Sequence, residues 1–157
     1  VRSAEDISAL FAALPAQPDV AIYNPSYRTR GPLIELDPEE VRRTIEVCAF
    51  GAFLFAQQAA RAMLRAGQGT IIFTGASAGV KGYPRSAPFA MGKFALRGLA
   101  QSMARELHPQ NIHVGHVVID GGIRSARRPD EPGADKLLDP DAIAESYLHL
   151  ILSLIHI

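Results

Sequence analysis

Phe89 and Lys93 lie four residues apart at the start of a predicted helix. Because this spacing is close to one helical turn, the two side chains share one face of that helix. An ammonium on such a face can donate hydrogen bonds to a ligand, whereas a phenyl ring has no proton to give or take. The spacing therefore predicts a cation and an apolar ring side by side on one helix face.

A loop of small residues, 74–79, follows a predicted strand at 70–73. Ligands of α/β sheets bind at the carboxyl ends of the strands, so this loop predicts a ligand crevice. Ser77 is a candidate ligand contact there, although loop serines more often form turns. Tyr83 is either a substitute acid or a surface residue, and Ser86 is better explained as a helix N-cap.

Cys48 suggests a nucleophile that pairs with His113 or His116. A lone Cys on an apolar helix face is far more often a small buried residue, which is the reading we favour. The two histidines take opposite faces of a predicted strand, so they cannot act together. Asp120 ends that strand and either hydrogen-bonds a ligand or caps backbone donors in the loop.

The composition excludes several functional classes. The 157 residues, 48% of them hydrophobic, are enough for one domain with a substantial core. Sixteen basic and sixteen acidic side chains cancel without a run of like charge, so neither nucleic acid nor a membrane surface is an expected partner. The single cysteine leaves no Cys cluster for a metal and is typical of a reducing cytoplasm. The most apolar stretch, 47–60, is too short to span a membrane.

Predicted strands alternate with predicted helices along the chain. Apolar periodicity indicates the helices, and short apolar runs indicate buried strands. The expected order is helix 3–14, strand 20–23, helix 38–66, strand 70–73, helix 86–107, strand 112–119, loop 124–138 and helix 140–150. Such alternation is typical of right-handed βαβ units on a parallel sheet, which predicts the α/β class.

Together these segments resemble the short-chain dehydrogenase/reductase family over about residues 1–151. The resemblance implies an incomplete Rossmann-type fold, with a doubly wound parallel sheet. It also implies NAD or NADP as the cofactor and a small carbonyl or alcohol compound as the substrate. In the family, the two long helices pack subunits together, so a homodimer or homotetramer is implied.

The family's catalytic residues are Asn, Ser, Tyr and Lys, and only Lys93 stands at its place. Cys48, Ala76 and Phe89 occupy the Asn, Ser and Tyr positions. In the family the phenol supplies the proton that accompanies hydride transfer, while the ammonium lowers its pKa and binds the nicotinamide ribose. The resemblance assigns the cofactor contacts to Asn24, Lys93, Asp120, Gly121, Ile123 and Ser125, and the substrate pocket to Ser77 and Tyr83.

Two functional hypotheses follow from these departures. General acid-base catalysis contributes roughly 10²- to 10⁴-fold, and the usual groups for it are absent. The first hypothesis is an oxidoreductase whose proton comes from water, from Tyr83 or from the substrate. The second is a dinucleotide-binding or scaffold protein that has kept the fold and given up the chemistry.

The two ends of the chain also depart from the family pattern. No segment like G-x-G-x-x-G precedes Ser3, so we expect an incomplete domain, 1–151, that lacks the glycine-rich βαβ unit. Such a piece should bind a dinucleotide weakly or not at all. Residues 152–157 resemble translated adapter sequence and are expected to be a non-native tail, the alternative being an extension of the last helix.

Overall fold

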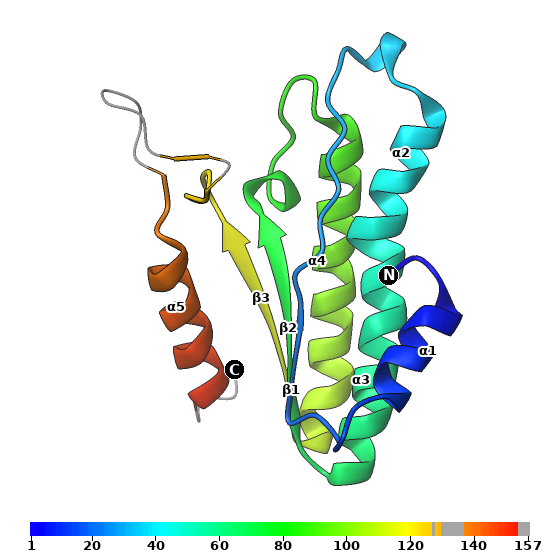
Figure 1. Cartoon of the computed structure of the whole chain (residues 1–157), viewed down its shortest axis with the longest axis vertical. Helices are drawn as coiled ribbons and strands as arrows, with labels where there is room; N and C mark the ends of the chain where they lie inside the picture. Colours follow the sequence, from blue (N-terminus) through cyan, green and yellow to red (C-terminus); the bar gives the residue numbers. More distant parts are fainter. Residues whose placement is uncertain (127, 130–136, 154–157) are drawn as a thin grey trace. The chain divides into compact units, whose positions relative to one another are not determined.

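The computed structural model describes residues 1–126, 128, 129 and 137–153, which divide into two compact units, 1–118 and 119–157 (Figure 1). Within the described residues the sheet has three strands in the order β1-β2-β3. They are β1 (Val20–Tyr23), β2 (Gly69–Ala76) and β3 (Ile112–Ile119). β1 and β2 pair in parallel, with Tyr23 opposite Phe73. The predicted α/β class and incomplete Rossmann-type sheet are confirmed.

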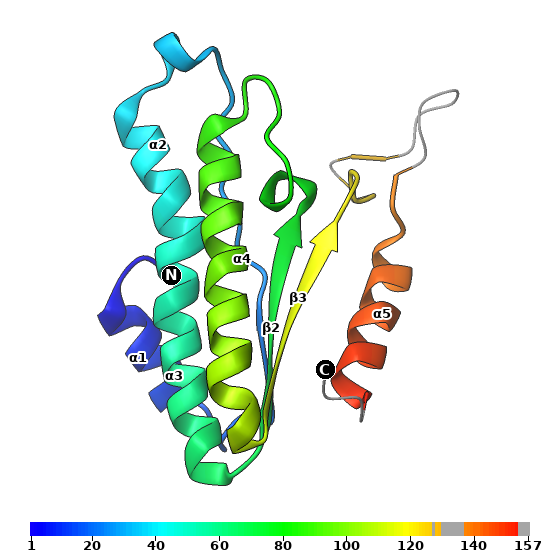
Figure 2. The same cartoon turned by 180° about the vertical axis from the view of Figure 1, so that it is seen from behind.

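Two long helical stretches lie side by side in the first unit, against one face of its sheet (Figures 1 and 2). One consists of α2 (Pro38–Ile45), a π-helical turn η2 (Glu46–Phe50) and α3 (Gly51–Ala66), and the other is α4 (Ala87–Leu107). The core side of α3 carries buried side chains at helical spacing, namely Ala52, Ala56, Ala59 and Met63. Small alanine side chains let this helix approach the sheet closely.

Local sequence explains where the first stretch begins and ends. The Asp37 side chain accepts a hydrogen bond from the Glu39 N–H at 3.0 Å, and Pro38 follows at the first helical position. Gly67 ends the stretch with φ 77°, a left-handed conformation that glycine adopts without steric cost. The predicted bounds of 38–66 are therefore confirmed.

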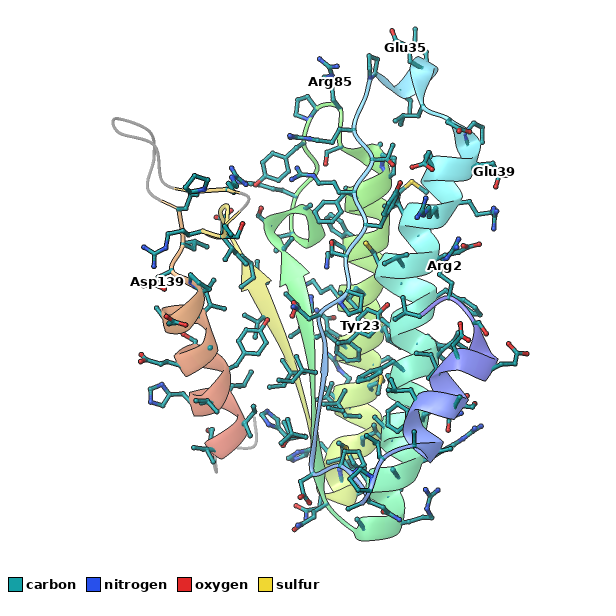
Figure 3. All side chains as sticks on the ribbon, viewed as in Figure 1. Arg2, Tyr23, Glu35, Glu39, Arg85 and Asp139 are labelled. Carbon is teal, nitrogen blue, oxygen red and sulfur yellow. The ribbon has the colours of Figure 1, made fainter. Side chains whose placement is uncertain are left out.

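The π-helical turn was not predicted from the sequence. Tyr23, labelled in Figure 3, lies on β1, and its hydroxyl donates to the Val47 carbonyl of this turn at 2.6 Å. A Cβ on Gly51 would lie 2.7 Å from the same hydroxyl oxygen, so only glycine fits there. The irregular turn is thus satisfied by a side chain from a distant segment, which local periodicity cannot indicate.

Other element bounds differ from the predicted ones. α1 (Ala4–Ala12) is shorter than the predicted 3–14, and β2 continues to Ala76 through half of the predicted loop. Short helical turns that were not predicted are η1 (Leu33–Glu35), η3 (Ser77–Gly79) and η4 (His108–Gln110).

The second unit contains α5 (Pro140–Leu152), which is two residues longer than predicted. Part of the predicted loop 124–138 is ordered by pairing, because Ile123 bridges Leu138 and Ser125 bridges Arg128. Of the predicted non-native tail, Leu152 belongs to α5 and 154–157 lie outside the described residues.

By length and composition alone, the 29-residue helical stretch Pro38–Ala66 is apolar enough to cross a membrane, with a mean hydropathy of 1.3 in its most apolar window. The expectation that this region is too short for a span is therefore wrong by that criterion. The buried alanines and Met63 of α3 are nevertheless typical of a core helix in a globular domain.

Candidate active site

Cys48, Ala76 and Phe89 meet in one buried cluster together with Ala78. They come from three segments, the π-helical turn η2, the end of β2 and the first turn of α4. The structure thus brings together the three residues that the family resemblance predicts at the Asn, Ser and Tyr positions. None of these four side chains has a hydroxyl or carboxyl group, so the cluster is apolar.

Lys93 lies one turn after Phe89 on the same side of α4 and is 2% exposed. Its Nζ donates to the Thr74 carbonyl at 2.8 Å and lies 5.6 Å from the centre of the Phe89 ring. Burial lowers the pKa of Lys93, and the nearby Cys48 thiol opposes that shift. A buried ammonium is costly unless it is hydrogen-bonded, so its presence at the end of β2 favours a functional role.

The Phe89 ring contacts a second cation. The guanidinium carbon of Arg28 lies 4.9 Å from the ring centre. Arg28 follows β1 in the chain, and no pattern in the sequence predicts this contact. Two cations, Arg28 and Lys93, therefore lie close to the Phe89 ring.

Cys48 is fully buried, as predicted. Its thiol donates to the Tyr27 carbonyl at 3.4 Å. A Cβ on Gly92 would lie 2.7 Å from the Cys48 Cβ, so α4 and the π-helical turn are in close contact here. This packing supports the interpretation of Cys48 as a small core residue.

The other predicted contacts of the first unit lie around this cluster. Asn24 is exposed directly after β1, and the pairing of Tyr23 with Phe73 places it beside Thr74 at the same edge of the sheet. Ser77 opens η3, and its carbonyl accepts hydrogen bonds from the N–H groups of residues 80 and 81, as a turn residue does. Tyr83 is 37% exposed, with the Lys81 ammonium 5.3 Å from its ring centre, so it lies on the surface.

The remaining predicted cofactor contacts belong to the second unit. Asp120 and Gly121 follow β3, and both are exposed. Ile123 and Ser125 are exposed and take part in the bridges described above. These four residues stay predictions of cofactor contact.

The structure contradicts the prediction that the Ser86 side chain caps α4. Ser86 occupies the N-cap position of α4, as expected, but its side chain makes no capping hydrogen bond. The residue is fully buried, and its Oγ has no hydrogen-bond partner among the described residues. The capping role is therefore wrong, and a buried hydroxyl without a partner requires another explanation.

His116 lies on β3, and its Nε2 is also buried without a partner among the described residues. Burial lowers its pKa below the ordinary value of 6.5, and the positive charges of Arg97 and Lys93 lower it further. A Cβ on Gly75 would lie 2.4 Å from this nitrogen, so β2 leaves the imidazole no room to move toward it.

The lowered pKa of His116 predicts a loss of stability in acid. As pH falls below 6.5, the unfolded chain binds a proton at this position that the folded chain does not yet bind, so the free energy of unfolding decreases until pH reaches the lowered value. Denaturant unfolding of wild type and His116→Gln, followed from about pH 8 to about pH 5, should show a flatter dependence for the variant. The same dependence in both proteins would contradict this prediction; His149→Gln, at an exposed position, serves as the control.

Known proteins resemble this chain in both sequence and structure. The family profile for short chain dehydrogenases matches residues 1–131. The trans-4-hydroxycyclohexanecarboxylate dehydrogenase of Sinomonas cyclohexanicum is 39% identical over 99 residues, which cover 63% of this chain and 38% of that protein. The 2,5-dichloro-2,5-cyclohexadiene-1,4-diol dehydrogenase of Sphingobium indicum is 30% identical over 156 residues, covering 96% of this chain and 60% of that protein. The chain thus spans less than two thirds of the length of either relative.

A solved short-chain dehydrogenase from Rhodopseudomonas palustris superposes with a TM-score of 0.81 at 36% identity. The superposition covers 97% of this chain and 65% of that one. A 4-hydroxyisoleucine dehydrogenase complexed with NADH and succinate superposes with a TM-score of 0.84 at 23% identity, covering 99% of this chain and 71% of that one, which is a likeness of fold alone.

Proposed function

The chain belongs to the short chain dehydrogenase family, and on that premise we propose that the protein transfers a hydride between NAD or NADP and a small carbonyl or alcohol compound. The observation that supports this proposal is Lys93, a buried ammonium at the carboxyl end of β2. Because the chain spans only part of its curated relatives, the activity proposed is that of the native protein that contains these residues.

The donors around β2 suit the nicotinamide ribose. An ammonium has three N–H donors, and the hydrogen bond to Thr74 uses one of them. Lys93 and the exposed Asn24 amide would hold the ribose hydroxyls, and Asp120, Gly121, Ile123 and Ser125 would contribute the further contacts. NAD(P)H, when bound, supplies the hydride.

The remaining residues of the site would shape the substrate pocket. Phe89 and the alanines of its cluster would form an apolar wall of the pocket, and none of them can protonate the reacting carbonyl. Ser77 is the proposed substrate contact from the loop after β2. In this scheme the proton comes from water, from Tyr83 or from the substrate itself.

A second candidate function is that of a dinucleotide-binding protein without catalytic activity. The observation that favours it is the apolar cluster of Cys48, Ala76 and Phe89, which removes the family's acid and its partners together. In that case the buried ammonium would serve binding alone.

Nucleotide oxidation separates the two candidates. We expect the native protein to consume NADH or NADPH above a no-enzyme control when given 4-oxocyclohexanecarboxylate, the ketone that corresponds to the alcohol in the name of the Sinomonas relative. Binding of NAD(P)H without turnover over a panel of small ketones would support the second candidate. Absence of both binding and turnover would contradict both.

We also propose a homodimer or homotetramer that packs through α3 and α4. A groove of about 350 Å³ lies between these helices, with Phe53, Leu64, Leu99 and Met103 among the residues that line it. Phe50, Phe53 and Phe94 are 43–51% exposed, which favours a covered surface in the assembly. A cytoplasmic location is proposed from the single reduced cysteine and the proposed cofactor.

A further inference from the structure

The Ser86 hydroxyl is buried without a hydrogen-bond partner in the part of the chain that the structure describes. A hydroxyl removed from water costs free energy unless it is hydrogen-bonded, so folded proteins seldom keep one without a purpose. Its backbone, by contrast, is fully engaged, since the Ser86 N–H donates to the Tyr83 carbonyl and its own carbonyl accepts from Ala90. The side-chain hydroxyl is therefore the polar group of Ser86 that makes no hydrogen bond among the described residues.

The position of Ser86 relates it to the proposed active site. Ser86 lies directly before α4, whose first turn carries Phe89 and whose second turn carries Lys93. The backbone before Ser86 is held in place, because the Gly31 N–H donates to the Arg85 carbonyl at 3.1 Å and Arg85 has φ 58°. Figure 3 shows Arg85 at the end of the unit where the loops before α2 and α4 lie.

Apart from Lys93, the other side chains of this site cannot donate a hydrogen bond to a substrate oxygen. Cys48, Ala76 and Phe89 form the apolar cluster, and the Cys48 thiol already donates to a carbonyl. Tyr83 lies on the surface under the Lys81 ammonium. Among the described residues, Ser86 therefore has a buried hydroxyl with donor capacity left, directly before the turn of α4 that carries Phe89.

We propose that the Ser86 hydroxyl donates a hydrogen bond to the reacting oxygen of the substrate, in place of the phenol that Phe89 lacks. This inference rests on the proposed hydride transfer and identifies the residue that binds the carbonyl oxygen of the substrate. The serine keeps its proton, because an aliphatic hydroxyl is far too weak an acid to give it up at neutral pH. Its effect is to orient the carbonyl and stabilise the negative charge that develops on oxygen.

The test compares Ser86→Ala with wild type in the native protein that contains this chain, with NAD(P)H and 4-oxocyclohexanecarboxylate. We expect kcat/KM to fall by about 10- to 10²-fold, because one donor to the developing oxyanion is lost. We expect the melting temperature to stay the same or rise, because the change removes a buried hydroxyl that has no partner. Ser86→Cys, which keeps the side-chain volume with a weaker donor, should give a smaller loss and covers the case in which Ser86→Ala does not fold.

Two controls separate this role from a structural one. Ser146→Ala removes a hydroxyl that already donates to the Ala142 carbonyl, so it should leave kcat/KM unchanged. In a protein that also carries Ala76→Ser and Phe89→Tyr, the loss caused by Ser86→Ala should shrink, because the new phenol takes over the hydrogen bond. A purely structural serine would cause the same loss in both backgrounds.

Each outcome decides between the two proposals. Normal kcat/KM in Ser86→Ala overturns the role of Ser86 and leaves the proposed function standing, and a lower melting temperature with normal kcat/KM shows that the serine is structural. If wild type shows no turnover but the ketone raises the melting temperature of wild type and not of Ser86→Ala, the carbonyl site stands and the proposed hydride transfer fails. If the ketone neither reacts nor binds, both proposals are overturned.

Discussion

Phe89→Tyr combined with Ala76→Ser should raise kcat/KM for carbonyl reduction by about 10²- to 10⁴-fold, the usual contribution of a positioned general acid. The Lys93 Nζ lies 5.6 Å from the centre of the Phe89 ring, and the guanidinium carbon of Arg28 lies 4.9 Å from it. A tyrosine at this position would therefore have its ring close to two cations. Positive charge lowers the pKa of a phenol, which makes it a better proton donor near neutral pH. The serine would provide the second hydrogen bond to the substrate oxygen.

The measurement is NAD(P)H oxidation by wild type, by each single variant and by the double variant. Groups that act as one unit give non-additive effects, so most of the gain should need both substitutions. The double variant should also acquire a pH dependence of kcat/KM from the new phenol. Phe94→Tyr, on the same helix and 46% exposed, is the matched control and should leave the rate unchanged. A double variant no faster than wild type would mean that the site is not arranged for hydride transfer.

Lys93→Met should weaken NAD(P)H binding by roughly 10²-fold or more, since hydrogen bonds to charged groups contribute about 1.5–3 kcal/mol each. Methionine fills the space of the lysine stem without the buried charge. Fluorescence titration of the native protein with NADH and NADPH measures the change in Kd. Lys81→Met, at an exposed lysine, is the control. An unchanged Kd in Lys93→Met would contradict a ribose-binding role and, with it, the observation that supports the proposed function.

The stability of Lys93→Met gives a second, independent readout. Burial lowers the pKa of Lys93 from its ordinary value of 10.5, so the folded protein releases this proton at a lower pH than the unfolded chain. Wild-type stability should therefore rise with pH between the lowered value and 10.5, because the unfolded chain binds more protons there. The methionine variant should lack that rise, and a rise of equal size in the variant would show that another group causes it.

The regular parts of the fold could be predicted from local sequence. Asp37 and Pro38 mark the start of one helix and Gly67 marks its end, and each acts through its own backbone geometry. The strands at 20–23 and 112–119 are short apolar runs with buried positions, so their bounds were also predictable. The convergence of Cys48, Ala76 and Phe89 was predicted from the family resemblance.

Features that depend on distant contacts could not be predicted in this way. The π-helical turn depends on the Tyr23 hydroxyl, which comes from another segment. Arg28 reaches the Phe89 ring from a loop with no periodic pattern. Ser86 has the residue type and position of an N-cap, and only the absence of its capping hydrogen bond among the described residues distinguishes it from one.

The close contact between Gly92 and Cys48 limits which family residues could be introduced at the predicted site. Two of the three predicted departures, at Ala76 and at Phe89, would each be undone by adding a single oxygen atom. The third would not, because asparagine is larger than cysteine and Cys48 is fully buried against a helix that admits no side chain at position 92. An asparagine at position 48 would therefore require α4 to move away from the π-helical turn, so the predicted Asn position is the one where the family's residue is hardest to introduce.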